Sequence, residues 1–215
     1  MGLPSLLVAK RASPAPRPRS PRGVFSARID EALALAATAH HDQKRKGSGV
    51  PYIQHPVHVA MLLLRHGFDE AVIVAALLHD VVEDSDVELG TIEARFGRRV
   101  ARLVGGATEQ KAEGGVLRPW RARKEEALAA LRRAGRDGVA LKAADALHNC
   151  CSTLAHVREI GPAAWTRFHA PADQQAWYYA EIARIVRAKL GDHPLARELG
   201  RVVRELARVA HASDA

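Results

Sequence analysis

The sequence predicts an all-α protein, folded as a single domain of about eight to ten helices. Ala, Leu, Arg and Glu, which suit helices, are abundant, whereas aromatic residues make up only 5% of the 215 positions. From Ser26 onward the pattern is one helix after another, and no segment alternates with the period of a strand. A chain of this length favours one domain that needs no disulfide or structural metal to fold.

The start of the chain has a composition of its own. Residues 1–25 are rich in Pro, Arg and Ser and contain no acidic residue. Such a segment buries too little apolar surface to offset its chain entropy, so we expect a disordered basic leader. An organellar transit peptide is the alternative for an Arg- and Ser-rich start. The folded domain is expected over residues 26–212.

The helices can be placed by their caps and by their apolar pattern. Ser26 is a suitable N-cap for the first helix, with Asp30 in its first turn. Pro56 favours the start of the second helix and Gly67 its end. The third is apolar on nearly all sides and should lie at the centre. Glycines between 105 and 119 predict a mobile connection. Helices are expected at residues 28–43, 56–66, 69–83, 88–96, 98–105, 120–134, 137–156, 172–190 and 194–211.

The charge distribution argues against a nucleic-acid partner. The net charge is +8, but +5 of it comes from the leader, and the remainder mixes both signs like an ordinary solvated surface. The adjacent Cys150 and Cys151 form neither a typical disulfide nor a zinc motif, which fits a reducing cytoplasm. No apolar run reaches the length of a membrane span. We therefore expect a cytoplasmic protein with a small-molecule partner, and the sequence leaves its oligomeric state open.

The end of the central helix carries an acidic cluster. Its sequence is His79-Asp80-Val81-Val82-Glu83-Asp84, and helical spacing places Asp80 beside Glu83 and Asp84. Three carboxylates repel one another at the edge of a core, and a divalent cation would remove that cost. The alternative is that these acids face water at the helix C-terminus, where the helix dipole disfavours them.

A polar stripe interrupts the apolar segment VALKAADALHN. Asp145 and Asn149 are four residues apart and share a helix face, which Ser152 continues. His148 points away from Asn149 and is expected to be buried or to hydrogen-bond a ligating residue. Such a stripe marks either a site or a structural network. Together with His79, Asp80 and Asp145, His55 would form a mixed set of His and Asp ligands, which suits Mn, Fe or Zn rather than Ca. The residues by themselves therefore indicate a divalent metal site.

Four segments occur in order over residues 32–156: AHHDQKRKGSGVPYIQHPV, AALLHDVVEDS, IEARFGRRVARLVGGATE and LKAADALHN. Together they resemble the hydrolase domain of the Rel/SpoT alarmone enzymes and its stand-alone small relatives, which are HD-type phosphohydrolases. The resemblance implies an all-helical HD-type domain. It also implies Mn²⁺-dependent hydrolysis of (p)ppGpp, with release of pyrophosphate from the 3′ position.

The resemblance further implies a centre with one divalent ion. Its ligands match four residues of this sequence: His55, His79, Asp80 and Asp145. Mn²⁺ is the ion expected from the family, and the same set of ligands also allows Fe²⁺ or Zn²⁺. Glu83 and Asp84 match the acidic pair that takes the proton of the attacking water.

Substrate contacts are implied in the same way. Arg45 and Lys46 match the basic pair that contacts the nucleotide, with a solvated run of loop charges as the alternative. Asn149 and Ser152 match residues that line the ribose and the base.

Two positions depart from the family pattern. Ala146 stands where the residue after the metal-binding Asp is commonly Arg or Lys, and Cys151 replaces a second basic residue. Hydrolysis of another nucleotide or phosphoester, such as NADPH, is therefore the alternative. A non-catalytic nucleotide-binding HD protein is a further alternative, against which the intact acidic pair argues. The segments WTRF (165–168) and DQQAWYYAEI (173–182) fall outside the matched motifs.

Overall fold

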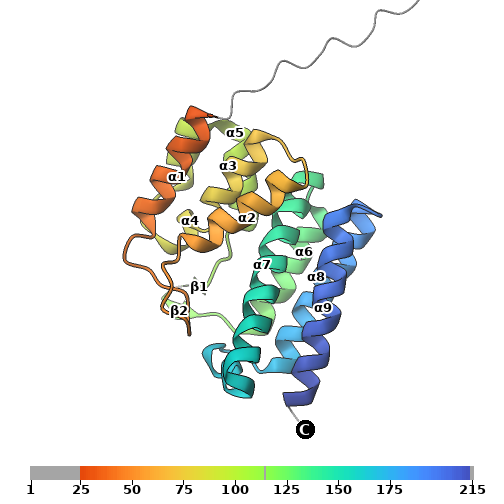
Figure 1. Cartoon of the computed structure of the whole chain (residues 1–215). Helices are drawn as coiled ribbons and strands as arrows, with labels where there is room; N and C mark the ends of the chain where they lie inside the picture. The colour runs from red at the N-terminus through yellow and green to blue at the C-terminus, as the bar shows by residue number, and fades with distance from the viewer. Residues whose placement is uncertain (1–24, 114, 214–215) are drawn as a thin grey trace, which may run out of the picture.

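The computed structural model describes residues 25–113 and 115–213, so the predicted leader lies outside the described residues except for Phe25. The described part is built from helices, which confirms the all-α prediction. Figure 1 shows α1 to α5 gathered on one side and α8 and α9 on the other, with α7 between them. The helices are α1 (Ala27–Ala39), α2 (Gln54–Arg65), α3 (Glu70–Leu78), α4 (Val81–Asp84), α5 (Leu89–Ala107), α6 (Trp120–Arg133), α7 (Arg136–Ile160), α8 (Ala172–Leu190) and α9 (Pro194–Ser213). None of these helices has both the length and the apolar composition needed to cross a membrane.

The predicted caps of the first helices are confirmed. The side chain of Ser26 accepts a hydrogen bond from the backbone amide of Ile29 at 3.2 Å. At the end of α2, Gly67 has a φ of 76°, the left-handed conformation that glycine adopts most readily. Ser26 therefore defines the start of α1, and Gly67 defines the end of α2.

Helix α3 lies at the centre of the domain, as its apolar sequence predicts. Every residue from Ala71 to Leu78 is buried. The expected continuous helix over 69–83 is wrong, because α3 ends at Leu78 and a new turn, α4, begins at Val81. Nδ1 of His79 lies 2.8 Å from the carbonyl oxygen of Ala76, which is the acceptor that the amide of Asp80 would use in a continuous helix.

Helix α5 bends at Gly97, between the two helices that the sequence predicts here. The backbone of Gly97 has φ 80° and ψ 163°, which is outside the helical region. The carbonyl group of Phe96 lies directly before this bend. The guanidinium of Arg28 on α1 donates to that oxygen and so joins α1 to α5.

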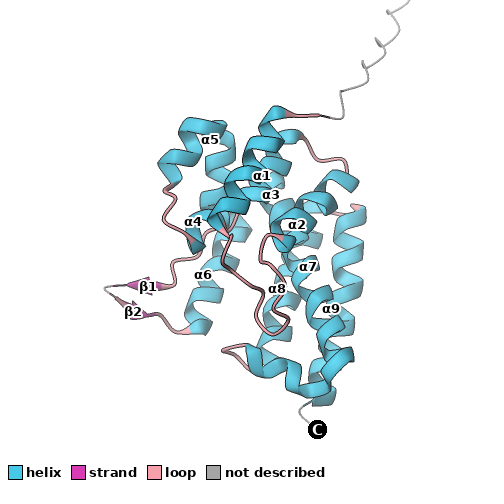
Figure 2. Cartoon of the chain, turned by 60° about the vertical axis from the view of Figure 1, so that its left-hand side comes forward, coloured by secondary structure: helices cyan, strands magenta, loops and turns pink. Residues whose placement is uncertain are grey.

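The connection after α5, where the sequence predicts a mobile segment, contains two short strands that the sequence does not predict. The strands β1 (Ala112–Glu113) and β2 (Val116–Leu117) form a short antiparallel hairpin. Figure 2 shows this hairpin projecting from the helical body. A ladder of two residues per strand is too short to produce a recognisable alternation in the sequence.

Helix α7 packs against helices of both halves and is the longest helix of the described chain. It continues four residues past the predicted end at residue 156 and stops at Gly161, whose φ is 70°. A 3-10 helix, η1 (Gly161–Arg167), follows and leads into α8. This turn places the WTRF segment beside the loop between α1 and α2, because the side chain of Arg167 donates to the backbone oxygen of Lys46.

The bend of α5 generates a stability prediction. Gly97→Ala should lower the free energy of unfolding by about 1–3 kcal/mol, because alanine tolerates this backbone conformation poorly. An added Cβ would meet no atom closer than 3.9 Å, so the cost comes from the backbone and not from a clash. The matched control is Gly106→Ala, also in α5 and open to solvent, which should raise stability by about 0.5–1 kcal/mol. Urea unfolding measures the free energy of unfolding of both variants. A Gly97→Ala variant as stable as the Gly106→Ala control would contradict the prediction that this backbone conformation is costly for alanine.

Candidate metal centre

Helices α2 and α7 and the junction between α3 and α4 bring the four predicted metal ligands together. His55 lies in the first turn of α2, His79 and Asp80 lie between α3 and α4, and Asp145 lies in the middle of α7. Nε2 of His55 is 3.3 Å from Oδ1 of Asp145 and 3.5 Å from Oδ2 of Asp80. Nε2 of His79 is 3.2 Å from the same oxygen of Asp80. One ligand atom each from His55, His79 and Asp80 lies within 4.8 Å of the others, and Asp145 borders this group through His55.

The two histidines have the chemistry that a divalent ion requires. Nδ1 of His79 is occupied by the carbonyl oxygen of Ala76, while its buried Nε2 has no hydrogen-bond partner among the described residues. Nδ1 of His55 lies 2.8 Å from Nδ1 of His148, and its Nε2 faces the carboxylates. Burial lowers the pKa of His55 and keeps it in the neutral form that ligates metals. An imidazole held from behind in this way is typical of a metal ligand, so the group fits a divalent cation.

Polar partners hold the two aspartates in position. Burial alone would raise the pKa of Asp145, but the ammonium of Lys142, 2.8 Å from Oδ2, outweighs burial and holds this pKa well below its ordinary value. The amide of Asn149 donates to Oδ1 of Asp145 at 2.6 Å. Asp80 accepts a hydrogen bond of 2.7 Å from the hydroxyl of Tyr52, and burial together with Asp80 raises the pKa of that hydroxyl. Both carboxylates are therefore fixed in position, and Asp145 is held in its charged form.

The acidic pair Glu83 and Asp84 lies at the edge of this centre, on α4. The ammonium of Lys111 joins the two carboxylates, at 2.8 Å from Oε1 of Glu83 and 2.7 Å from Oδ1 of Asp84. These two carboxylates raise the pKa of Lys111 against the effect of its burial. The backbone amide of Glu109 donates to the other oxygen of Glu83 at 2.8 Å. The pair is therefore held on both sides by the segment that precedes the hairpin.

The predicted substrate residues divide into two groups. Arg45 donates to Oδ1 of Asn149 at 2.7 Å, and Asn149 in turn donates to Asp145, so a chain of hydrogen bonds links the α1–α2 loop to the metal centre. The guanidinium of Arg45 also lies 5.5 Å from the ring centroid of Tyr52. Lys46 is exposed in the same loop, and Ser152 is half-buried on α7 about one turn beyond Asn149. The structure therefore joins Arg45 and Asn149 to the centre and places Lys46 and Ser152 close to them in the chain, outside the group of predicted ligands.

The two departures from the family pattern lie away from Arg45 and Asn149. Ala146 is fully buried in the core. Cys151 is about 200° around α7 from Asn149, and burial together with the charge of Glu198 on α9 raises the pKa of its thiol. A cation at either position would not face the loop of Arg45. The alternative substrate that these two departures suggested therefore has no support in the geometry.

Several residues of the site were missed by the sequence interpretation. Lys142 stands three residues before Asp145 on one helix face, so its contact could have been predicted from spacing. Tyr52 and Lys111 lie in irregular segments, where no periodicity indicates the direction of a side chain. The prediction that His148 is buried or bonds a ligating residue is confirmed by its contact with His55.

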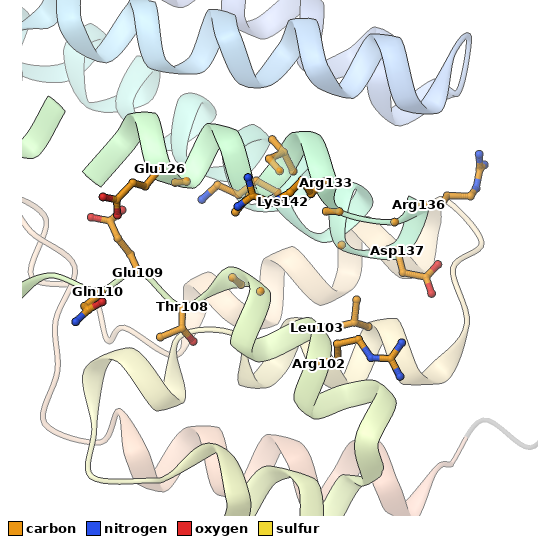
Figure 3. A pocket seen from close by; sticks show the side chains of 18 of the residues that line it. Arg102, Leu103, Thr108, Glu109, Gln110, Glu126, Arg133, Arg136, Asp137 and Lys142 are labelled. Atoms are coloured by element: carbon orange, nitrogen blue, oxygen red, sulfur yellow. The ribbon is translucent and has the colours of Figure 1, made fainter. Parts of the chain in front are cut away.

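A cavity of about 1000 Å³ lies behind the centre, between α5, α6 and the start of α7. None of the predicted site residues lines it, but Glu109 and Lys142 do, and both also bond residues of the centre. Figure 3 shows Glu109, Gln110 and Glu126 at one end of the cavity and Arg102, Arg136 and Asp137 at the other. This cavity and the metal centre therefore share a wall.

Known proteins resemble the chain in sequence. Mouse MESH1, named as a guanosine-3′,5′-bis(diphosphate) 3′-pyrophosphohydrolase, is 33% identical over 172 residues, which cover 79% of this chain and 88% of the mouse protein. A protein of Aquifex aeolicus with the same enzyme name is 49% identical over 81 residues, or 38% of this chain. The match spans only 12% of that longer protein, and only 10% of a similarly named Synechocystis protein.

Solved structures and a family model agree with this similarity. The structure of a metazoan ortholog of SpoT, described as hydrolysing ppGpp, has a TM-score of 0.70 and 27% identity, and the match covers 86% of this chain and 98% of that one. A protein of Listeria monocytogenes has a TM-score of 0.65 and 34% identity over 77% of this chain. The model of the HD domain family matches residues 32–164, so this chain belongs to the HD domain family.

Proposed function

We propose that this chain hydrolyses (p)ppGpp and releases pyrophosphate from the 3′ position. The observation that carries the proposal is the buried His/Asp group beside the acidic pair Glu83 and Asp84, with a cationic loop facing it. The mouse relative and the metazoan SpoT ortholog, which match this chain over most of its length, are named for the same reaction. Proteins that only bind nucleotides have no need of a pair of acids next to a metal site.

The metal-binding residues are proposed as His55, His79, Asp80 and Asp145. Membership of the HD domain family implies a divalent metal, and two imidazoles with two carboxylates suit Mn²⁺, which we propose as the ion in place of Fe²⁺ or Zn²⁺. When bound, such an ion acidifies water and offsets the negative charge of a phosphate. Neutral His55 and ionised Asp145 are already in the protonation states that ligation requires, so binding needs no change at either group.

Glu83 and Asp84 are proposed to accept the proton of the attacking water. In the reaction, water attacks the phosphorus joined to the ribose 3′ oxygen, the bond between these two atoms breaks, and the 3′ oxygen gains a proton. A carboxylate that takes the proton of the water must have a free oxygen close to it. One oxygen of Glu83 is held by the Glu109 amide, which leaves the other for proton transfer once Lys111 moves to a phosphate of the substrate.

The nucleotide is proposed to lie along α7, beside the α1–α2 loop. Arg45 is held over the Tyr52 ring by Asn149 and can stack on a purine, as a planar guanidinium does well. Lys46 is exposed in the same loop and can approach a phosphate. Asn149 and Ser152 are proposed to contact the ribose and the base from α7.

The substrate assay tests the proposal directly. The purified chain, incubated with Mn²⁺, should release pyrophosphate from ppGpp and should leave NADPH unchanged. Pyrophosphate and inorganic phosphate are measured separately, so that release of pyrophosphate is distinguished from removal of single phosphates. Absence of ppGpp hydrolysis by the folded, metal-loaded chain would overturn the proposal.

The Asp80→Ala substitution should abolish metal binding. We expect ppGpp hydrolysis to fall by about 10³-fold or more, because several kcal/mol of charge stabilisation would be lost. Asp86→Ala is the matched control, since Asp86 is a nearby exposed acid, and it should keep both metal and activity. Elemental analysis and pyrophosphate release are measured together. An Asp80→Ala variant with full metal content would show that the ion lies elsewhere.

The acidic pair can be separated from the metal ligands. Glu83→Gln and Asp84→Asn keep the size of each side chain, so both variants should retain the metal. The variant that lacks the proton-accepting carboxylate should have a turnover number about 10²–10⁴-fold lower than that of the unmodified chain. Single-turnover kinetics with metal-loaded protein measure this step. Normal turnover in both variants, and in the double variant, would contradict a role for the pair in proton transfer.

A further inference from the structure

A cluster of cations lies along α7 from Asn149 onward. Arg45 and Lys46 belong to the α1–α2 loop, and Arg167 at the end of η1 reaches the same loop from the other side. The charged and ionisable groups that act on Arg167 are Arg45 and Tyr179, and neither is an acid that pairs with it. The metal centre, by contrast, contains four carboxylates: Asp80, Glu83, Asp84 and Asp145. Along α7, the acidic centre therefore lies at Asp145, and the cations lie at Asn149 and Thr153.

Arg167 is held in position but is not neutralised. Its NH1 group donates to the carbonyl oxygen of Lys46 at 3.3 Å, and its NH2 group donates to Oγ1 of Thr153 at 3.0 Å. Its buried Nε has no hydrogen-bond partner within the described chain. Burial, and then the positive charge of Arg45, lower the pKa of Arg167. An arginine remains protonated even so, and a desolvated cation facing another cation is costly without an anion.

The loop is shaped to approach Arg167 closely. Gly47 has a φ of 86°, and a Cβ at this position would lie 3.2 Å from Cδ of Arg167 and 3.1 Å from Nε2 of His156. The guanidinium carbon of Arg167 also lies 4.7 Å from the ring centroid of Phe168. These contacts fix the plane of the guanidinium, so its unused N–H groups have a defined direction. A preorganised donor of this kind is suited to a ligand with several acceptor oxygens.

The position of Arg167 along α7 relates it to the metal centre. Asn149 bonds Asp145, and Thr153, which bonds Arg167, lies one helical turn further along and donates to the backbone oxygen of Asn149. A nucleotide whose 3′ diphosphate lies at the metal ligands would extend its other end in this direction. In (p)ppGpp that end carries the phosphates on the 5′ oxygen.

We infer that Arg167 binds the 5′ phosphates of the substrate and selects nucleotides that are phosphorylated at both ends. The inference rests on the proposed function and deepens it. The anion supplies the negative charge that the guanidiniums of Arg167 and its neighbour Arg45 lack in the described structure. Arg167 is thus a specificity-determining residue, remote from the bond that breaks.

Two substrates test this assignment. The variant Arg167→Gln is compared with the unmodified chain on ppGpp and on guanosine 3′-diphosphate, which has no 5′ phosphate. For ppGpp, KM should rise by about 10- to 100-fold with kcat unchanged, because a charge-assisted hydrogen bond to the substrate is lost. For guanosine 3′-diphosphate, neither constant should change, and Arg167→Lys should restore part of the preference for ppGpp. An equal rise of KM for both substrates would overturn the inference, because Arg167 would then contact the base or stabilise the loop instead of binding the 5′ phosphates.

A binding experiment separates this inference from the proposed reaction. Guanosine 5′-diphosphate is titrated into metal-free protein, and Arg167→Gln should weaken its binding about 10-fold or more. The control is Arg158→Gln, because Arg158 is exposed and pairs with Glu205 of α9; it should bind as the unmodified chain does. Equal affinities in the Arg167→Gln variant and the unmodified chain, or no binding to either, would overturn the inference.

The two failures are distinguishable. Binding that depends on Arg167 in a chain that does not hydrolyse ppGpp would overturn the proposed reaction and support the 5′ phosphate site. Hydrolysis of ppGpp with no change of substrate preference in Arg167→Gln would support the reaction and overturn the site.

Discussion

The pairing of buried Asp145 with Lys142 is the interaction on which the centre depends. A carboxylate in the middle of a helix whose other faces are core would be protonated or expelled without a partner, and Lys142 supplies one from the preceding turn of the same helix. Oδ1 of charged Asp145 lies 3.3 Å from Nε2 of His55, so the start of α2 and the middle of α7 meet at the centre. The same need for partners explains why Tyr52 faces Asp80 and why His148 lies behind His55.

Helix α7 carries this arrangement across the molecule. It contacts α2 and α5 in one half of the fold and α8 and α9 in the other. Residues at helical spacing along it contact successive groups: Asp145 at the centre, Asn149 at the link to Arg45, and Thr153 at Arg167. Helix α7 thus sets the spacing between the acidic centre and the cations.

The sequence predicted the helices well because their signals are local. The cap at Ser26, the stop at Gly67 and the bend between residues 96 and 98 all depend on residues within one or two turns. The break at His79 was missed because the apolar run before it looks like the interior of a longer helix, and the competing bond comes from a side chain. The association of His55 with Asp145 depends on tertiary packing, so residue spacing alone could not predict it. The prediction came from the four family motifs that occur in order along the sequence. Arg167 lies outside those motifs, and only the fold brings it to the loop of Arg45.

The opposed charges along α7 favour a substrate that is itself highly charged along its length. The acidic centre repels phosphates until a cation covers its carboxylates, whereas the cations Arg45, Lys46 and Arg167 attract them at once. Under the proposed function, binding would therefore begin at these cations, and the group to be cleaved would then reach the proposed metal ligands. At the acidic centre, the ammonium of Lys111 neutralises Glu83 and Asp84 until a phosphate competes for it. The acidic pair would then become free for proton transfer as the substrate arrives, which joins recognition of the nucleotide to the start of the reaction.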